Sequence, residues 1–150
     1  GLAQTQQIWA KAGLHTKSAV LIDGSGLNGN LITADNQVQL ETIMAKAPHA
    51  AAWRSALPIL GVDGSLFQVQ THSPAAGNVF AKTGTLGGID IFNGRFIVPT
   101  KALGGCIDAR DGRRLAFAII VTNSVFPDLE GVFEANDDVG KIAATIQQAY

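Results

Sequence analysis

The sequence predicts a layered α/β fold of the α+β kind, in which an antiparallel sheet is flanked by helices. Two observations carry this prediction. Apolar residues follow helical spacing in the first third and again near the C-terminus, and the second half contains several β-branched or apolar runs separated by Gly, Pro and Asn. The 150 residues contain no internal repeat, charge block or low-complexity linker, so we expect one unit over residues 1–150.

Helices are expected at both ends of the chain. Residues 3–12 favour a short helix that ends at Gly13, a residue suited to a left-handed C-cap. Thr33 is expected to cap a second helix, and a third is expected over 49–57. The second helix has an apolar face made of Leu40, Ile43, Met44 and Ala47. Asn136 is expected to cap a closing helix with an apolar stripe made of Val139, Ile142, Ala143 and Ile146.

Strands are expected first at 18–22, before a glycine-rich loop, and then through the second half of the chain. The later runs are 78–83, 96–100, 101–108 and 114–123. The pair Asp111-Gly112 predicts a hairpin between the last two. Residues 115–121 (LAFAIIV) are all apolar, which predicts a strand buried on both faces at the middle of the sheet.

Composition excludes several classes of protein. A hydrophobic content of 47% with 15% charged residues excludes a disordered chain. A formal net charge of −1 gives no electrostatic basis for a nucleic-acid partner. No apolar run approaches the roughly 20 residues that span a bilayer. The single cysteine, Cys106, excludes an internal disulfide, and we expect it to be a small buried side chain.

No metal and no organic cofactor are predicted. The three histidines lie far apart and lack a second ligand at a recognised spacing; they are His15, His49 and His72. The loop DGSGLNGN at 23–30 lacks the alternating oxygen ligands and closing Glu of a calcium loop. The glycines that a phosphate loop places before Lys-Thr are absent before Lys82.

Five segments in a fixed order carry a family resemblance. They are DGSGL (23–27), LPILGVDGSL (57–66), AKTGTL (81–86), KALGG (101–105) and GRRLAFAIIVTN (112–123). This series resembles the C-terminal part of the class C low-molecular-mass penicillin-binding proteins, the D-Ala-D-Ala carboxypeptidase and endopeptidase family. The tail NDDVGKIAATI is similar to that family's closing helix. The resemblance implies one segment of a transpeptidase-like domain, located outside the cytoplasm on the periplasmic or cell-wall side.

The resemblance also implies catalytic residues on the Lys-Thr-Gly strand. Lys82 would attract the terminal carboxylate of the substrate, and the hydroxyls of Thr83 and Thr85 would hydrogen-bond to it. The backbone N–H of Thr85 would form half of an oxyanion hole. Gly84 would leave room for the substrate to lie against the strand as an added β-strand.

Substrate binding is expected to involve Leu86 and Asn28 in addition to Gly84. After DGSGL the family usually continues with Ser-Arg, whereas Leu27 is followed here by Asn28, so peptide specificity is open. Residues 89–100 (IDIFNGRFIVPT) are longer than in shorter relatives. We expect this insertion either to wall the cleft or to pack on the remainder of the domain.

The other two motifs of this chemistry, Ser-x-x-Lys and Ser-x-Asn, are absent. None of the six serines has Lys three positions on or Asn two positions on; they are Ser18, Ser25, Ser55, Ser65, Ser73 and Ser124. In the family both motifs lie upstream of DGSGL. We therefore expect Gly1 to be a boundary within a longer protein, an upstream part to carry the nucleophile, and this chain alone to be inactive.

The expected partners are peptidoglycan peptides, β-lactams and the upstream part of the same protein. Because the family forms one sheet from its first and last strands, residues 115–123 would otherwise leave an apolar edge open to self-association. Two alternatives are a relative that hydrolyses β-lactams or other esters, and a non-catalytic binding domain with the same fold. An upstream Ser-x-x-Lys would decide against the binding domain.

Overall fold

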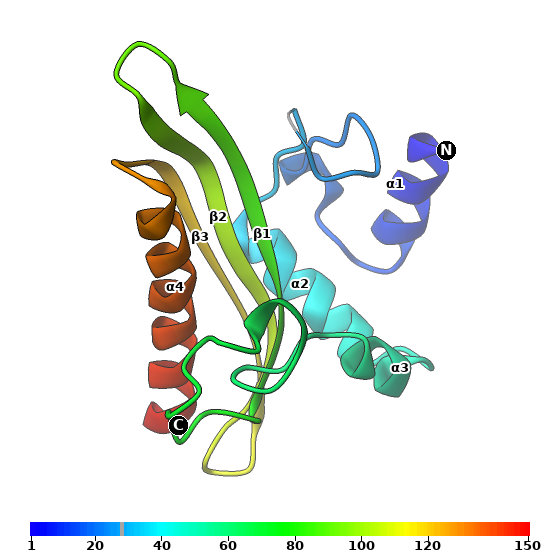
Figure 1. Ribbon diagram of the computed structural model, residues 1–150. Helices are drawn as coiled ribbons and strands as arrows, with labels where there is room; N and C mark the ends of the chain where they lie inside the picture. The colour runs from blue at the N-terminus through cyan, green and yellow to red at the C-terminus, as the bar shows by residue number, and fades with distance from the viewer. Residues whose placement is uncertain (28) are drawn as a thin grey trace.

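A computed structural model describes residues 1–27 and 29–150, so the prediction for Asn28 lies outside the described residues. The chain order is α1 (Leu2–Lys11), η1 (Thr16–Ser18), α2 (Ala34–Ala45), α3 (Ala50–Ser55), η2 (Gly64–Leu66), β1 (Val79–Asp90), β2 (Arg95–Asp108), β3 (Arg114–Phe126) and α4 (Leu129–Ala149). The strands form one antiparallel sheet with β2 between β1 and β3 (Figure 1). An antiparallel sheet flanked by helices was the predicted fold class, and it is confirmed.

The sheet lies between two helical layers. Helix α4 runs along one face and contacts all three strands, whereas α2 crosses the other face and contacts β2 and β3 (Figure 1). Helix α3 continues from α2, and α1 contacts the short helix η1. Within the described part of the chain, no helix combines the length and apolarity needed to cross a membrane. Helix α4 therefore covers one face of the sheet, and α2 covers the other.

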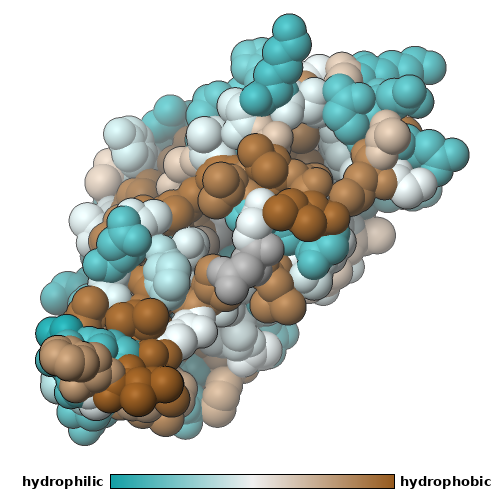
Figure 2. Space-filling view, turned by 90° about the horizontal axis from the view of Figure 1, so that it is seen from above, coloured by the Kyte–Doolittle hydropathy of each residue, from teal (hydrophilic) through white to brown (hydrophobic). Residues whose placement is uncertain are grey.

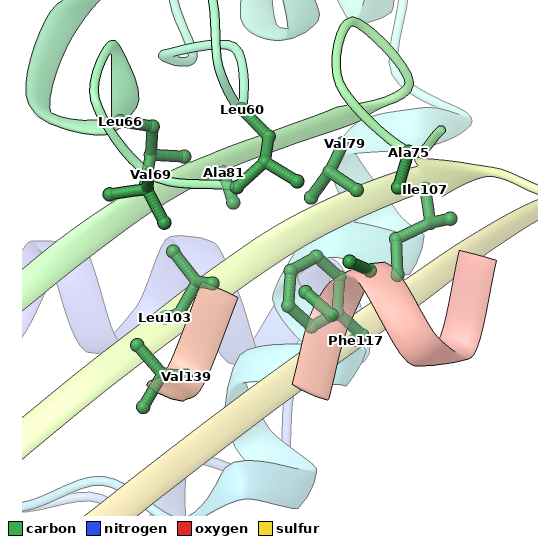
Figure 3. Packing of buried hydrophobic residues seen from close by; sticks show 12 residues of the cluster. Leu60, Leu66, Val69, Ala75, Val79, Ala81, Leu103, Ile107, Phe117 and Val139 are labelled. Atoms are coloured by element: carbon green, nitrogen blue, oxygen red, sulfur yellow. The ribbon is translucent and has the colours of Figure 1, made fainter. Parts of the chain in front are cut away.

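The face under α4 holds the hydrophobic core. Side chains from the strands, from α4 and from the loop before β1 meet there (Figure 3). Its buried members are Leu60, Leu66, Val69, Ala75, Val79, Ala81, Leu103, Ile107, Phe117, Val139, Ala143 and Ala144. Helix α4 approaches closely at Gly140, where an added Cβ would overlap a methyl group of Val69. The core on this face is therefore filled by side chains of this chain itself.

The face under α2 is polar and only partly buried. The predicted apolar stripe of α2 does not reach a core, because Leu40, Ile43, Met44 and Ala47 are all half-buried. Glu41 is buried instead, and it accepts hydrogen bonds from Gln37 Nε2 and Trp53 Nε1, both at 2.9 Å. Gln37 lies so close to Gly104 that an added Cβ would sit 2.9 Å from its Cγ. The cap predicted at Thr33 is confirmed by a 3.1 Å hydrogen bond from the Asn36 N–H.

An ion cluster completes this second face. Arg54 pairs with Asp108 through a 2.8 Å hydrogen bond, lies 3.6 Å from the centre of the Phe80 ring, and shares Asp108 with Arg114. The hydrogen bond from Arg54 is the main reason that the pKa of Asp108 lies below its usual value. Cys106, expected to be buried, is only half-buried beside this cluster, and burial still raises the pKa of its thiol.

The predicted strands 96–100 and 101–108 form one strand, β2. Pro99 does not end it, although proline cannot donate a ladder hydrogen bond. The register with β3 omits Pro99, and the residue facing it in sequence order, Asn123, has φ +58°. On the other side the register with β1 shifts between Leu86 and Gly88. A local irregularity in both ladders therefore accommodates the proline.

Strand β3 is an edge strand of the described sheet, so residues 115–121 do not lie at its middle as predicted, whereas the open edge expected for residues 115–123 is present. Phe117 alone is buried in this run, and Val121 is exposed. Helices cover both faces of the sheet while the outer backbone edge of β3 stays open, so an all-apolar run need not be a central strand. The hairpin predicted at Asp111-Gly112 is confirmed, with Gly112 at φ +85°.

Two other boundaries differ from the predictions. Residues 18–22 form only an isolated bridge between Val20 and Leu31, because the Ile22 N–H is taken by the Asn30 side chain at 2.7 Å. Helix α4 begins well before Asn136. Asp128 is its N-cap and accepts a 3.0 Å hydrogen bond from the Gly131 N–H. An aspartate after a proline caps the helix here, which leaves Asn136 in its interior.

The insertion at 89–100 forms the tip of the β1–β2 hairpin. The tip projects beyond the helices at the top of Figure 1, and the view from that side shows apolar patches on the surface (Figure 2). Ile91 is 89% exposed and Phe92 is 95% exposed. Asp90 fixes the turn by accepting hydrogen bonds from Asn93 and Arg95. The tip therefore contacts neither helical layer through these two apolar side chains.

Candidate active-site edge

The Lys-Thr-Gly-Thr sequence lies on β1 where the outer edge of that strand opens. Before this point the edge is covered: the Leu60 N–H donates to Val79 O and the Ala81 N–H donates to Pro58 O, both at 2.9 Å. Beyond Ala81, no strand within the described residues pairs with the outer side of β1. The open edge therefore begins at Lys82.

Backbone alternation places the groups of two threonines on this open edge. In an antiparallel ladder, both polar backbone groups of a residue point to the same side and alternate along the strand. Val79 and Ala81 use theirs on the outer side, so those of Thr83 and Thr85 also point outward. The Thr85 N–H thus faces open space, as an oxyanion donor must. The Thr83 carbonyl accepts a 2.7 Å hydrogen bond from Lys82 Nζ.

The side chains of the motif divide between the two faces of the sheet. Lys82 and Gly84 lie opposite Gly104 and Ala102, on the face that α2 covers. Thr83 and Thr85 lie on the other face, opposite Leu103 and Lys101. The predicted residues are therefore consecutive along one edge but do not share one face. Only a ligand lying along the edge itself reaches both sets.

Thr83 is held by a residue that carried no sequence prediction of its own. Its hydroxyl donates to the hydroxyl of Ser65, in η2, at 2.9 Å. The turn before η2 is fixed by Asp63, whose carboxylate accepts the Ile59 N–H at 2.7 Å. Ser65 belongs to the segment LPILGVDGSL, so the sequence marked the segment but could not show which strand residue it contacts.

Thr85 contacts a second unpredicted residue. Lys101 Nζ donates to Thr85 Oγ1 at 2.8 Å, and Lys101 is only 6% exposed whereas Thr85 is exposed. Burial lowers the pKa of Lys101, and the positive charge of Lys82 lowers it further. The pairing depends on the register between β1 and β2, which no local pattern in the sequence specifies.

Two further residues of the predicted binding site, Gly84 and Leu86, also lie on β1. Gly84 has ordinary backbone angles, and an added Cβ would lie 3.6 Å from the Ala102 Cβ, an ordinary contact. Packing within the chain therefore does not require glycine at 84. Leu86 is half-buried opposite Thr100, just before the register shift. Among residues 1–27 and 29–150, no cluster of three or more His, Cys, Asp or Glu is placed to hold a metal ion.

The sequence matches one protein-family model over almost its whole length. The model describes the D-Ala-D-Ala carboxypeptidase 3 (S13) family and matches residues 1–143. The matched range includes all of β1 and β2 and most of α4.

Characterised relatives are similar over most of this chain. A D-alanyl-D-alanine carboxypeptidase from Actinomadura sp. (strain R39) is 36% identical over 126 residues, which cover 80% of this chain and 21% of the relative. Carboxypeptidase DacB from Mycolicibacterium smegmatis is 35% identical over 75% of this chain and 24% of the relative. The chain thus spans about a quarter or less of the length of these relatives.

Solved structures show the same partial match. Penicillin-binding protein 4 (dacB) from Haemophilus influenzae superposes with a TM-score of 0.69 at 22% identity, over 91% of this chain and 31% of that one. A structure of the same protein complexed with a β-lactam gives a TM-score of 0.66 at 28% identity, over 83% of this chain and 27% of that one. The described fold therefore corresponds to part of a larger structure.

Proposed function

Because the chain belongs to the D-Ala-D-Ala carboxypeptidase 3 (S13) family, we propose that it forms the C-terminal part of a serine-type D-Ala-D-Ala carboxypeptidase or endopeptidase. The substrate would be a peptide of peptidoglycan. In the proposed reaction, a serine hydroxyl attacks the peptide carbonyl and transfers its proton to a base, and the C-terminal amine leaves with a proton. Water then hydrolyses the acyl-serine ester and restores the serine.

One observation carries this proposal: the outer edge of β1 is open from Lys82 onward. A substrate peptide would add to that edge as an antiparallel strand. Its carbonyl oxygen would accept from the outward N–H of Thr85 as negative charge develops on it, an interaction worth about 3 to 4 kcal/mol in comparable sites. Lys82 would attract the terminal carboxylate, and the Thr85 hydroxyl would donate a hydrogen bond to it. The Thr83 hydroxyl would bind it only by giving up its hydrogen bond to Ser65.

We propose that the nucleophile comes from a part of the protein outside residues 1–150. None of the six serines lies in a Ser-x-x-Lys or Ser-x-Asn sequence, and the matched region covers only 21% and 24% of the length of two relatives. The chain alone is accordingly proposed to be inactive, and the whole enzyme to act outside the cytoplasm. β-Lactams are proposed as a second class of ligand for the same edge, because a related protein was solved with one.

Intact mass spectrometry after incubation with a penicillin tests this function. We expect a stoichiometric adduct on the full-length protein that contains this chain, and none on residues 1–150 alone. In the full-length protein, Lys82→Ala should slow acylation on the order of 10²-fold, since it removes preorganised positive charge beside the reacting groups. Lys46→Ala is the matched control, because Lys46 is an exposed lysine at the C-terminal end of α2.

Three other outcomes would each contradict part of the proposed function. An adduct on the 150-residue chain would mean that one of its serines is activated by a route without these motifs. No adduct on the full-length protein, together with retained binding of a D-Ala-D-Ala peptide, would favour the non-catalytic binding domain. Rapid release of the adduct would favour a β-lactam or ester hydrolase over a carboxypeptidase.

A further inference from the structure

Lys101 is a buried lysine beside the open edge. It stands directly opposite Thr85 in the register between β2 and β1, and its Nζ lies 2.8 Å from Thr85 Oγ1. Its stem shares the α4 face of the sheet with the buried side chain of Leu103. A lysine that is 6% exposed is unusual unless it is paired with an opposite charge.

Within residues 1–27 and 29–150, no carboxylate forms an ion pair with this ammonium group. Each ion pair found in the described part of the chain joins an arginine to an aspartate, and none includes Lys101. The charged side chain that acts on Lys101 is Lys82, which has the same sign. The ammonium groups of Lys82 and Lys101 therefore lie beside one stretch of open edge, and neither has a counter-ion among the residues that the structure describes. Such an arrangement favours an anionic ligand.

The direction of the hydrogen bond determines what Thr85 offers to a ligand. An ammonium group has three donors and no acceptor, whereas a hydroxyl has one donor and two acceptor positions. Thr85 Oγ1 must therefore accept from Lys101, which leaves the Thr85 O–H free to donate elsewhere. Thr83 differs, because its hydroxyl donates to Ser65. Of these two threonines, Thr85 is the one whose hydroxyl hydrogen is free.

We propose that Lys101 is a positioning residue that fixes the Thr85 hydroxyl as a hydrogen-bond donor to the terminal carboxylate of the substrate. The inference rests on the proposed function, because it names a further determinant of the same site. Lys101 does not touch the substrate, since its side chain is buried behind Thr85. It acts by orienting one hydroxyl and by adding positive charge behind it, so its effect depends on the negative charge of the ligand.

The test uses the full-length protein and two peptides that end in D-Ala-D-Ala, one with a free carboxylate and one with a C-terminal carboxamide. Lys101→Met keeps an unbranched side chain but removes the donor and the charge. We expect it to lower kcat/KM for the carboxylate peptide about tenfold, mainly through KM, and to change the carboxamide peptide less than about twofold. Lys101→Gln, which restores an N–H donor, should recover part of that loss.

A double-mutant cycle with Thr85→Val separates positioning from general stability. If Lys101 acts through Thr85, then Lys101→Met should add almost nothing to the loss caused by Thr85→Val. Lys141→Met, at an exposed position of α4, is the matched control for removing one lysine charge. Equal losses for both peptides, or full additivity with Thr85→Val, would overturn the proposal and indicate a structural role.

A binding measurement keeps this inference separate from the proposed function. N-acetyl-D-alanine serves as a carboxylate probe, and its binding is followed by NMR through the amide shift of Thr85. We expect saturable shifts in the unmodified protein and about tenfold weaker binding in Lys101→Met. If the unmodified protein cleaves neither peptide and is not acylated, the proposed function fails while this titration still decides the role of Lys101. Unchanged probe binding in Lys101→Met, or no binding of the probe to the unmodified protein, would overturn the role of Lys101.

Discussion

The two faces of the sheet differ in the interactions that hold their helices in place. Under α4, aliphatic side chains from strands, helix and loop form a closed core in which Leu103 is 1% exposed. Under α2, the contacts are hydrogen bonds and ion pairs, and the apolar residues of β3 on that side, such as Ile120, are only half-buried. Substitutions on the α4 face should therefore cost more of the free energy of unfolding than substitutions on the α2 face. The candidate site follows the edge where these faces meet.

Two glycines of adjacent strands should show the largest contrast. Gly105 lies directly opposite Ala81, and an added Cβ would overlap the Phe80 carbonyl oxygen and lie 2.7 Å from the Ala81 Cα. Gly105→Ala should cost about 3 kcal/mol or more of the free energy of unfolding. Gly84→Ala, where the new Cβ meets only an ordinary contact, should cost less than about 0.5 kcal/mol. Urea unfolding followed by circular dichroism measures both.

Gly84→Ala, the variant with the smaller expected effect on stability, should have the larger effect on activity. In the full-length protein, Gly84→Ala should lower the rate of penicillin acylation on the order of 10²-fold, because the methyl group displaces a ligand lying along the edge. Acylation that is unchanged in Gly84→Ala would mean that the ligand does not lie against this part of β1. It would contradict the proposed use of the edge.

Truncating one aliphatic side chain on each face compares the two layers directly. Leu103→Ala opens a cavity in the closed core and should cost about 3 kcal/mol, whereas Ile120→Ala at a half-buried position should cost about 1 kcal/mol. Thermal unfolding of the two variants gives the difference. Equal losses in the free energy of unfolding would show that both faces stabilise the chain to a similar degree.

Two positions on α4 test how its N-terminus is fixed. Asp128→Ala removes the N-cap hydrogen bond to the Gly131 N–H and should cost about 1 kcal/mol. Asn136→Leu should be neutral or stabilising, since the buried Oδ1 of Asn136 has no hydrogen-bond partner within the described residues. Urea midpoints of the two variants provide the check. A larger loss in Asn136→Leu than in Asp128→Ala would show that the cap is assigned to the wrong residue.

The smallest effect is a dependence of stability on pH, and it should arise on the α2 face. The pKa of Asp108 is lowered in the folded state, chiefly by its hydrogen bond with Arg54, so the unfolded state binds a proton more readily. Its contribution is fully present above the ordinary pKa of about 4 and is lost as the pH falls through the lower folded value. Asp108→Asn should lower stability at pH 7 and flatten its decline in acid, measured by urea titrations at several pH values. An unchanged acid dependence would exclude Asp108 as a source.

Local signals in the sequence were sufficient for some elements and insufficient for others. The cap at Thr33 and the Asp111-Gly112 turn depend on a few neighbouring residues, and both were predicted correctly. The start of α4 failed because Asp128 and Asn136 are both good caps and only the fold selects between them. The middle position predicted for residues 115–121 does not hold in the described sheet, because a run of apolar residues reports burial of its faces but not the number of neighbouring strands.

The candidate site was predictable only as far as its motif. The Lys-Thr-Gly segment and its order among other segments identified the strand, and the structure places it at an open edge. Ser65 and Lys101 were missed, because their contacts with Thr83 and Thr85 arise from residues 18 and 16 positions away in sequence. Contacts of this kind depend on strand register, which a single sequence does not encode locally.

The short segment Pro58–Leu60 blocks one end of the open edge of β1 and thereby limits where a bound peptide can end. A peptide that pairs antiparallel with β1 runs opposite to it, so its carboxyl end points toward Ala81. There the outer backbone groups are already occupied by Pro58 and Leu60. Such a peptide must terminate near Lys82, while its preceding residues extend past Thr85 toward the hairpin tip. In the proposed binding mode, residues beyond that carboxylate would find no vacant backbone group of β1 to pair with, so the proposed site would fit a free C-terminus better than the interior of a longer peptide.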